Sequence, residues 1–125
     1  MFGVFTDAGL PVILHSDGDI RPILPDLVEI GMTVLNPVQP EVLDHNWLRS
    51  EYGSKLAFYG GISTQSAMVA RNERSVREAA LACANTLASN GTGLLLGPSH
   101  RMQSDIPMES VDAMLDVFSE LERQA

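Results

Sequence analysis

Four short apolar runs recur along the chain, and each leads into a stretch with helical periodicity. The runs are continuously apolar rather than alternating, which is typical of strands covered on both faces in a parallel sheet. Each ends in Gly, Pro, Asn or His, and the four runs lie at 11–15, 33–37, 55–61 and 92–100. We therefore expect four buried strands.

The predicted helices occupy residues 20–31, 40–53, 75–91 and 107–125. Pro22 and Pro25 suit only the first turn of the first helix, and Gly31 is expected to end it. Ser75 and Glu78 have the spacing of a capping box for the third helix. The last helix is expected to bury four residues, Val111, Met114, Leu115 and Phe118.

The resulting order is (βα)₄, preceded by residues 1–10, which look like the tail of a helix ending at Gly9. Such alternation predicts parallel strands joined by right-handed crossovers in one α/β domain spanning residues 1–125. A flavodoxin-like open sheet and half of a (β/α)₈ barrel both fit this count. A full barrel takes about 250 residues, roughly twice this length.

The composition of the chain disfavours some classes of binding partner. The formal charge of −8 argues against nucleic acid and against an anionic membrane surface, because both require clustered Lys and Arg. The single cysteine cannot form an internal disulfide, and no segment reaches the length of a membrane span. A cytoplasmic location is expected.

Polar groups and glycines gather where the predicted strands end. Ligands bind at the carboxyl ends of parallel strands in both candidate architectures. The residues at these ends are His15, Asp17, Asn36, Gln39, Gly60, Gly61, His100, Gln103 and Asp105. This concentration predicts a ligand site at one edge of the sheet.

His15 and Asp17 are two residues apart, so on an extended chain both would point to the same side. With His100 they could hold zinc or a similar divalent ion and leave a position open for substrate. The same groups could bind an anion through protonated histidines, act as acid and base, or form an ordinary hydrogen-bonded turn. These alternatives stay open on the residues alone.

The remaining candidates each have a structural alternative. Gly60 and Gly61 could let a ligand approach the backbone, with hydroxyl and amide donors in the following Ser-Thr-Gln segment, or could fit a crowded strand end. Asn36, before a proline, could be a turn former. Cys83 is expected to be a small core residue, and His45 to face solvent.

Several segments, taken in order, resemble the C-terminal half of the uroporphyrinogen decarboxylase superfamily. They are "PVILHSDGDIRPILPDLVEIG", "LNPVQPE", "KLAFYGGISTQ" and "LGPSHRMQSDIPMESVDAM". The superfamily contains haem-pathway decarboxylases and zinc-dependent, corrinoid-linked methyltransferases, both built on a (β/α)₈ barrel. The resemblance therefore implies strands five to eight of a barrel, and an enzymatic family.

The two branches imply different roles. The resemblance first implies a decarboxylase-like function, with the methyltransferase as the alternative. A decarboxylase would carry out tetrapyrrole decarboxylation in porphyrin biosynthesis without a cofactor, and His100 falls on its substrate-contacting histidine. This chain has "PSH" and "GGISTQ" where decarboxylases have "GHG" and "GNLDP". In the methyltransferase reading, His15, Asp17 and His100 replace a ligand set containing two cysteines and would hold zinc that acts on a corrinoid-bound methyl group.

We assign catalysis to His100 and Asp17, and substrate contact to Asn36, Gln39, Gly60, Gly61 and Gln103. The resemblance places the catalytic aspartate and the propionate-binding arginines of decarboxylases in an N-terminal half that these residues do not include. Because half a barrel exposes edges and an inner face, we expect a truncated reading frame, a homodimer, or a separate partner supplying that half. A non-catalytic fragment is the remaining alternative.

Overall fold

The computed structural model describes residues 2–124 and confirms the predicted (βα)₄ order. A short helix, α1, precedes the first strand, and a 3₁₀ turn at Arg21–Ile23 leads into α2. The strands are β1 (Ile13–His15), β2 (Val34–Asn36), β3 (Ala57–Ile62) and β4 (Leu94–Pro98). The α-helices are α1 (Gly3–Asp7), α2 (Leu24–Glu29), α3 (His45–Tyr52), α4 (Glu73–Leu87) and α5 (Met108–Gln124).

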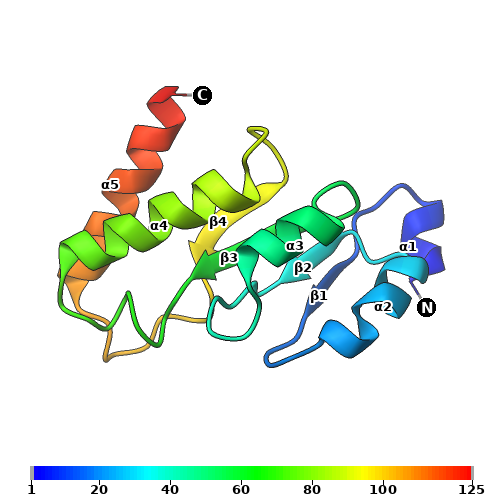
Figure 1. Cartoon of the computed structure of the whole chain (residues 1–125), viewed down its shortest axis with the longest axis horizontal. Coiled ribbons are helices and arrows are strands. Elements are labelled where there is room, and N and C mark those ends of the chain that lie inside the picture. Colours follow the sequence, from blue (N-terminus) through cyan, green and yellow to red (C-terminus); the bar gives the residue numbers. More distant parts are fainter. Residues whose placement is uncertain (1, 125) are drawn as a thin grey trace.

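All four strands are parallel and form one sheet in the order β1-β2-β3-β4 (Figure 1). Each strand therefore lies beside the next one in sequence. A flavodoxin-like sheet would instead reverse direction after its first strands and place helices on both faces. Successive right-handed crossovers without a reversal put the helices on one side, as in a barrel. The sheet order thus identifies a four-stranded segment of barrel-type fold.

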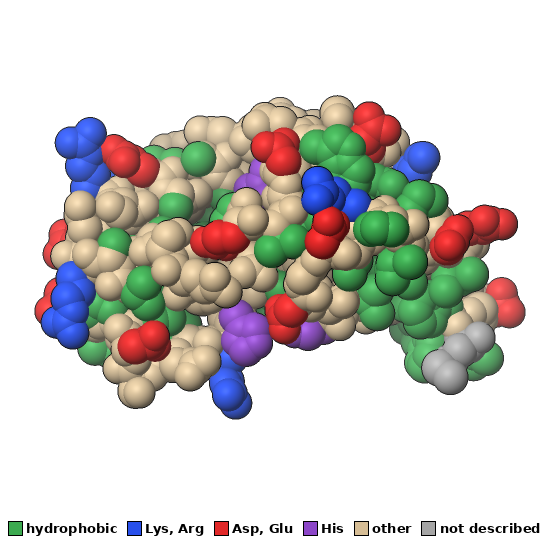
Figure 2. Space-filling model, turned by 60° about the horizontal axis from the view of Figure 1, so that its bottom comes forward, with side chains coloured by type: hydrophobic (Ala, Val, Ile, Leu, Met, Phe, Trp, Pro, Cys, Tyr) green, Lys and Arg blue, Asp and Glu red, His purple; other side chains and the backbone are tan. Residues whose placement is uncertain are grey.

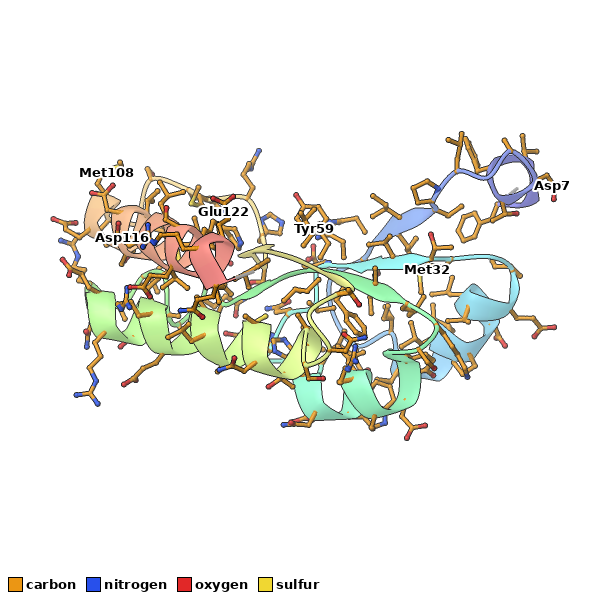
Figure 3. The ribbon with its side chains drawn as sticks, turned by 90° about the horizontal axis from the view of Figure 1, so that it is seen from above. Asp7, Met32, Tyr59, Met108, Asp116 and Glu122 are labelled. Atoms are coloured by element: carbon orange, nitrogen blue, oxygen red, sulfur yellow. The ribbon has the colours of Figure 1, made fainter. Side chains whose placement is uncertain are left out.

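The helices α2, α3 and α4 cover one face of the sheet (Figure 3). Residues of the paired strands that point toward these helices, including Leu35 and Phe58, are fully buried. Leu24, Leu48 and Leu87 of the three helices are also fully buried in this core. A second cluster lies where α5 packs on α4 and joins Val76, Ala80, Met114 and Val117.

The opposite face of the sheet carries exposed apolar side chains. Ile13, Tyr59 and Leu95 retain 55%, 37% and 62% of their accessible surface, and Tyr59 points away from α3 and α4 (Figure 3). In a closed barrel this face lines the interior and is filled by layers of side chains. Within residues 2–124 it stays open to solvent, so the prediction that the four strands are covered on both faces is wrong for this part of the fold.

Gly31 ends α2 as predicted. The amide of Gly31 donates to the Val28 carbonyl, and that of Met32 to the Leu27 carbonyl, the paired bonds of a Schellman motif. Gly31 has φ +104°, a conformation that glycine adopts without steric cost. The α-helix is shorter than expected because Arg21–Ile23, which include Pro22, form a 3₁₀ turn, and the α-helix begins at Leu24 with Pro25 in its first turn.

Two details of the helix predictions are wrong. The N-cap of α4 is Asn72, whose side chain accepts a hydrogen bond from the Arg74 amide, so Ser75 lies inside the helix. Leu115 is 50% exposed, because α5 packs on α4 through Ala113, Met114 and Val117 instead. No helix within residues 2–124 is long and apolar enough to cross a bilayer.

Candidate metal centre

The loops that follow the four strands gather at one edge of the sheet (Figure 1). β1 and β4 are the outer strands of the sheet. Nevertheless the rings of His15, at the end of β1, and His100, just after β4, have centroids 6.1 Å apart in an edge-on arrangement. The end of β1 and the loop after β4 thus bring these two residues together, although their strands are not neighbours in the sheet.

Asp17 lies between the two histidines. Its Oδ2 atom is 3.8 Å from His15 Nε2 and 3.9 Å from His100 Nε2, and potential ligand atoms of all three lie within 4.8 Å of one another. All three side chains are about half exposed, so they can rotate and can be reached from solvent. Figure 2 shows histidine side chains beside acidic ones near the lower edge of the face that it draws.

The donor set fits a divalent ion. Zinc lies about 2.0–2.1 Å from histidine nitrogen and carboxylate oxygen, so tetrahedral ligands stand roughly 3.3 Å apart. The observed separations to Asp17 exceed this value by about half an ångström, which small side-chain rotations would close. Two imidazoles and one carboxylate leave a fourth position open, as catalytic zinc sites do. His15, Asp17 and His100 could therefore hold zinc.

Asn36, at the end of β2, supports this cluster. His15 Nδ1 lies 2.5 Å from Asn36 Oδ1, and Asn36 Nδ2 donates to the Tyr59 carbonyl at 3.1 Å. The parallel register that pairs His15 with Asn36 places the two side chains next to each other. Asn36 thus links three neighbouring strands and contacts a predicted metal ligand, which goes beyond a turn-forming role.

A cavity of about 640 Å³ opens beside the cluster. Five of the predicted residues line it, namely Asp17, Gln39, His100, Gln103 and Asp105. Arg101, Thr64 and Gln65 also line the cavity. Thr64 and Gln65 belong to the Ser-Thr-Gln segment that was named from the sequence as a source of donors. Arg101 was not predicted from the sequence as a site residue, and only its position directly after His100 could have indicated it.

The other predicted residues lie outside this cavity. His15 and Asn36 line a neighbouring hollow of about 350 Å³, which also touches His100. Gly60 and Gly61 are buried in β3. A Cβ on Gly60 would approach the Pro98 carbonyl to 3.3 Å, and one on Gly61 would approach Cys83 Sγ to 2.3 Å. Crowding accounts for both glycines, and their contact with substrate stays a prediction.

His45 is half-buried, not solvent-facing as expected. Its Nε2 lies 2.8 Å from the Val38 carbonyl, because α3 begins against the loop that follows β2. Cys83 is buried as predicted, and burial raises the pKa of its thiol to about 12. Its position in α4, on the covered face of the sheet, separates it from the histidine cluster.

Asp17 and Asp19 have different surroundings although they flank one glycine. Arg21 donates two hydrogen bonds to the Asp19 carboxylate, at 2.8 and 2.6 Å. These bonds lower the pKa of Asp19 to about 2. The Asp19 carboxylate is therefore paired with the Arg21 guanidinium, whereas the Asp17 carboxylate faces the two histidines.

The fold defines a segment of a barrel-type α/β protein, and the polar cluster lies at the carboxyl ends of its strands. The chain matches the family model described as uroporphyrinogen decarboxylase (URO-D) over residues 4–121. It therefore belongs to that family. No curated protein matches it.

A solved methyltransferase from Methanosarcina mazei has a similar structure. Its TM-score is 0.70 at 19% sequence identity, and the match covers 94% of this chain. This likeness establishes the shared fold. The chain spans 33% of that protein's length, so the activity of a complete protein of this kind is a matter for proposal.

Proposed function

We propose that this chain carries the metal-binding half of a methyltransferase-type active site of the URO-D family, with His15, Asp17 and His100 as the ligands of a zinc ion. The observation that carries the proposal is the convergence of their ligand atoms within 4.8 Å, from opposite edges of the sheet. A bound zinc ion would act as a Lewis acid on the donor or acceptor of a methyl group.

The adjoining cavity suits a polar substrate. Gln39 and Gln103 offer amide donors and acceptors, and Arg101 offers a cation beside His100. In the methyltransferase role these residues would orient the methyl acceptor, while the corrinoid-bound methyl group would approach over the open side of the cluster. Asp17 and His100 would serve the reaction as metal ligands.

Tetrapyrrole decarboxylation is the second candidate, and the matching family description favours it. Here His100 would contact the substrate, and Asp17 would act in proton transfer. The described cavity is poorly suited to a substrate rich in carboxylates, because Asp17 and Asp105 line it and Arg101 is the one cation among its lining residues. We therefore rank this reaction below metal-dependent methyl transfer.

Further βα units would be needed to close the site. The face that carries Ile13, Tyr59 and Leu95 is apolar and open, and the similar methyltransferase is about three times as long as this chain. A second copy is a weaker candidate than a separate N-terminal half, because two copies would each bring a formal charge of −8. We propose that such a half, supplied by other residues, covers this face.

Isothermal titration of the metal-free chain with zinc tests the metal centre. We expect one ion per chain, and a loss of at least tenfold in affinity for His15→Ala, His100→Ala and Asp17→Asn. His45→Gln and Asp19→Asn are matched controls, since each removes the same type of group outside the cluster. Equal affinity in Asp17→Asn and Asp19→Asn would contradict the assignment.

Binding of a porphyrinogen by the metal-free chain would support the decarboxylase candidate. The discriminating variant is Arg101→Gln, which removes the cation of the cavity without touching the three proposed ligands. A porphyrinogen complex that weakens in this variant, together with no zinc binding by the unaltered chain, would replace methyl transfer by decarboxylation as the proposed function.

A further inference from the structure

The hydrogen bonds around Asn36 determine which nitrogen of His15 carries its proton. The inference rests on the proposed metal centre for its functional meaning, but the hydrogen bonds stand independently of it. Asn36 lies between two partners of unequal character: the backbone carbonyl of Tyr59 and the imidazole of His15.

The carbonyl of Tyr59 has no hydrogen and can only accept. The Asn36 side chain must therefore turn its NH₂ group toward Tyr59, in agreement with the 3.1 Å contact from Nδ2. This fixes the amide oxygen of Asn36 on the side of His15. The orientation of an asparagine amide is often ambiguous, but here a backbone acceptor decides it.

The amide oxygen of Asn36 is likewise only an acceptor. Its contact with His15 Nδ1, at 2.5 Å, therefore requires a proton on Nδ1. A neutral imidazole has one protonated nitrogen, so the lone pair of neutral His15 lies on Nε2. Nε2 is the atom that faces Asp17 Oδ2 at 3.8 Å.

We infer that Asn36 is a positioning residue that holds neutral His15 in the Nδ1–H tautomer and so presents the Nε2 lone pair to the metal centre. A histidine binds a metal through an unprotonated nitrogen, and a partner on the other nitrogen selects that tautomer and orients the ring. Among residues 2–124, His100 has no corresponding hydrogen bond. His15 is accordingly the pre-oriented ligand of the three, and His100 adjusts to the ion.

Nitrogen-15 NMR of the histidine side chains in the metal-free 125-residue chain tests this inference directly. In a neutral imidazole one nitrogen carries a proton and the other does not, so the two nitrogens have distinct shifts. The spectrum of His15→Gln identifies the His15 signals by their loss. We expect a protonated Nδ1 and an unprotonated Nε2.

Three variants separate positioning from mere strand stability. Asn36→Leu keeps the size and removes the acceptor, so we expect loss of the tautomer preference and a 10- to 100-fold weaker affinity for zinc, the usual effect of removing such a partner. Asn36→Asp keeps an acceptor oxygen and should retain the Nδ1–H form. Thr33→Val removes a hydroxyl that bonds the Val12 backbone across the same two strands, and should leave the tautomer unchanged.

The unaltered chain alone can overturn the inference, by showing a proton on Nε2 of His15 instead of Nδ1. Equal tautomer and zinc affinity in Asn36→Leu and the unaltered chain would overturn it as well. If the unaltered chain has the expected tautomer but binds no zinc, the metal centre fails while the role of Asn36 in orienting His15 stands.

Discussion

Gly61→Ala should be among the most destabilising single-methyl additions in this chain. The residue has φ +94°, and a Cβ built on it would lie 2.3 Å from Cys83 Sγ and 3.4 Å from His45 Cε1. A side chain in the left-handed region costs about 1–2 kcal/mol. Overpacking of a filled core costs about 1–3 kcal/mol more. The sum, about 2–5 kcal/mol, is a large part of the 5–15 kcal/mol that stabilises a typical domain.

Alanine variants of two other glycines separate the backbone cost of Gly61→Ala from its overpacking cost. Gly18 has φ +86° but nothing within 4 Å of a built Cβ, so Gly18→Ala should show only the backbone cost. Gly97 has an ordinary φ, and its Cβ would meet Tyr59 at 3.8 Å. Gly97→Ala should therefore change the free energy of unfolding by less than about 1 kcal/mol. Urea unfolding followed by circular dichroism gives all three values.

A double variant isolates the clash with sulfur. Cys83→Ala removes Sγ, so the cost of Gly61→Ala in that background should fall toward the cost of Gly18→Ala. The expected interaction energy is about 1–3 kcal/mol, within the range for residues in contact. A Gly61→Ala variant no less stable than Gly18→Ala would contradict this prediction. So would a cost of Gly61→Ala that stays the same when Sγ is removed.

Three further predictions concern ionisation and assembly. Because burial raises the pKa of Cys83 to about 12, its thiol should resist alkylation at pH 8 in the folded chain and react fully in urea. The pKa of Asp19 is lowered, so its bond to Arg21 stabilises the fold at pH values above the unfolded pKa of about 3.9 and loses that effect as the pH falls toward about 2. Asp19→Asn should therefore destabilise the chain at about pH 7 and have no effect on its stability near pH 2. Equal destabilisation at both pH values would contradict this prediction. Light scattering should show no stable homodimer, because the formal charge of −8 on each copy opposes pairing, and a tight dimer would contradict the proposed separate half.

Much of the fold could be predicted because the signals are local. Continuous apolar runs predicted the positions of the four strands, and Gly31 predicted where α2 ends. The cap of α4 was misplaced because Asn72 and Ser75 can both accept an amide bond, and the choice depends on where the preceding loop leaves the sheet. The exposure of Leu115 depends on which side of α5 meets α4, and that is a tertiary property.

The candidate site also has features that local sequence predicts and features that depend on the tertiary structure. His15, Asp17 and His100 could be named from their positions after apolar runs, because parallel strands end at a common edge. Their approach to within 4.8 Å depends on how the outer strands β1 and β4 are placed in the folded sheet, which no local sequence pattern records. The link from Tyr59 through Asn36 to His15 is likewise set by strand register across three strands, and could not be read from sequence spacing.

X-ray absorption at the zinc edge, on the chain loaded with one equivalent of zinc, tests the metal centre most directly. We expect nitrogen and oxygen ligands at about 2.0–2.1 Å, with the outer-shell scattering of two imidazoles and no sulfur. Loss of imidazole scattering in His15→Ala and in His100→Ala would identify both ligands. A zinc–sulfur shell at about 2.3 Å would place the ion at Cys83 instead and contradict a metal centre formed by His15, Asp17 and His100.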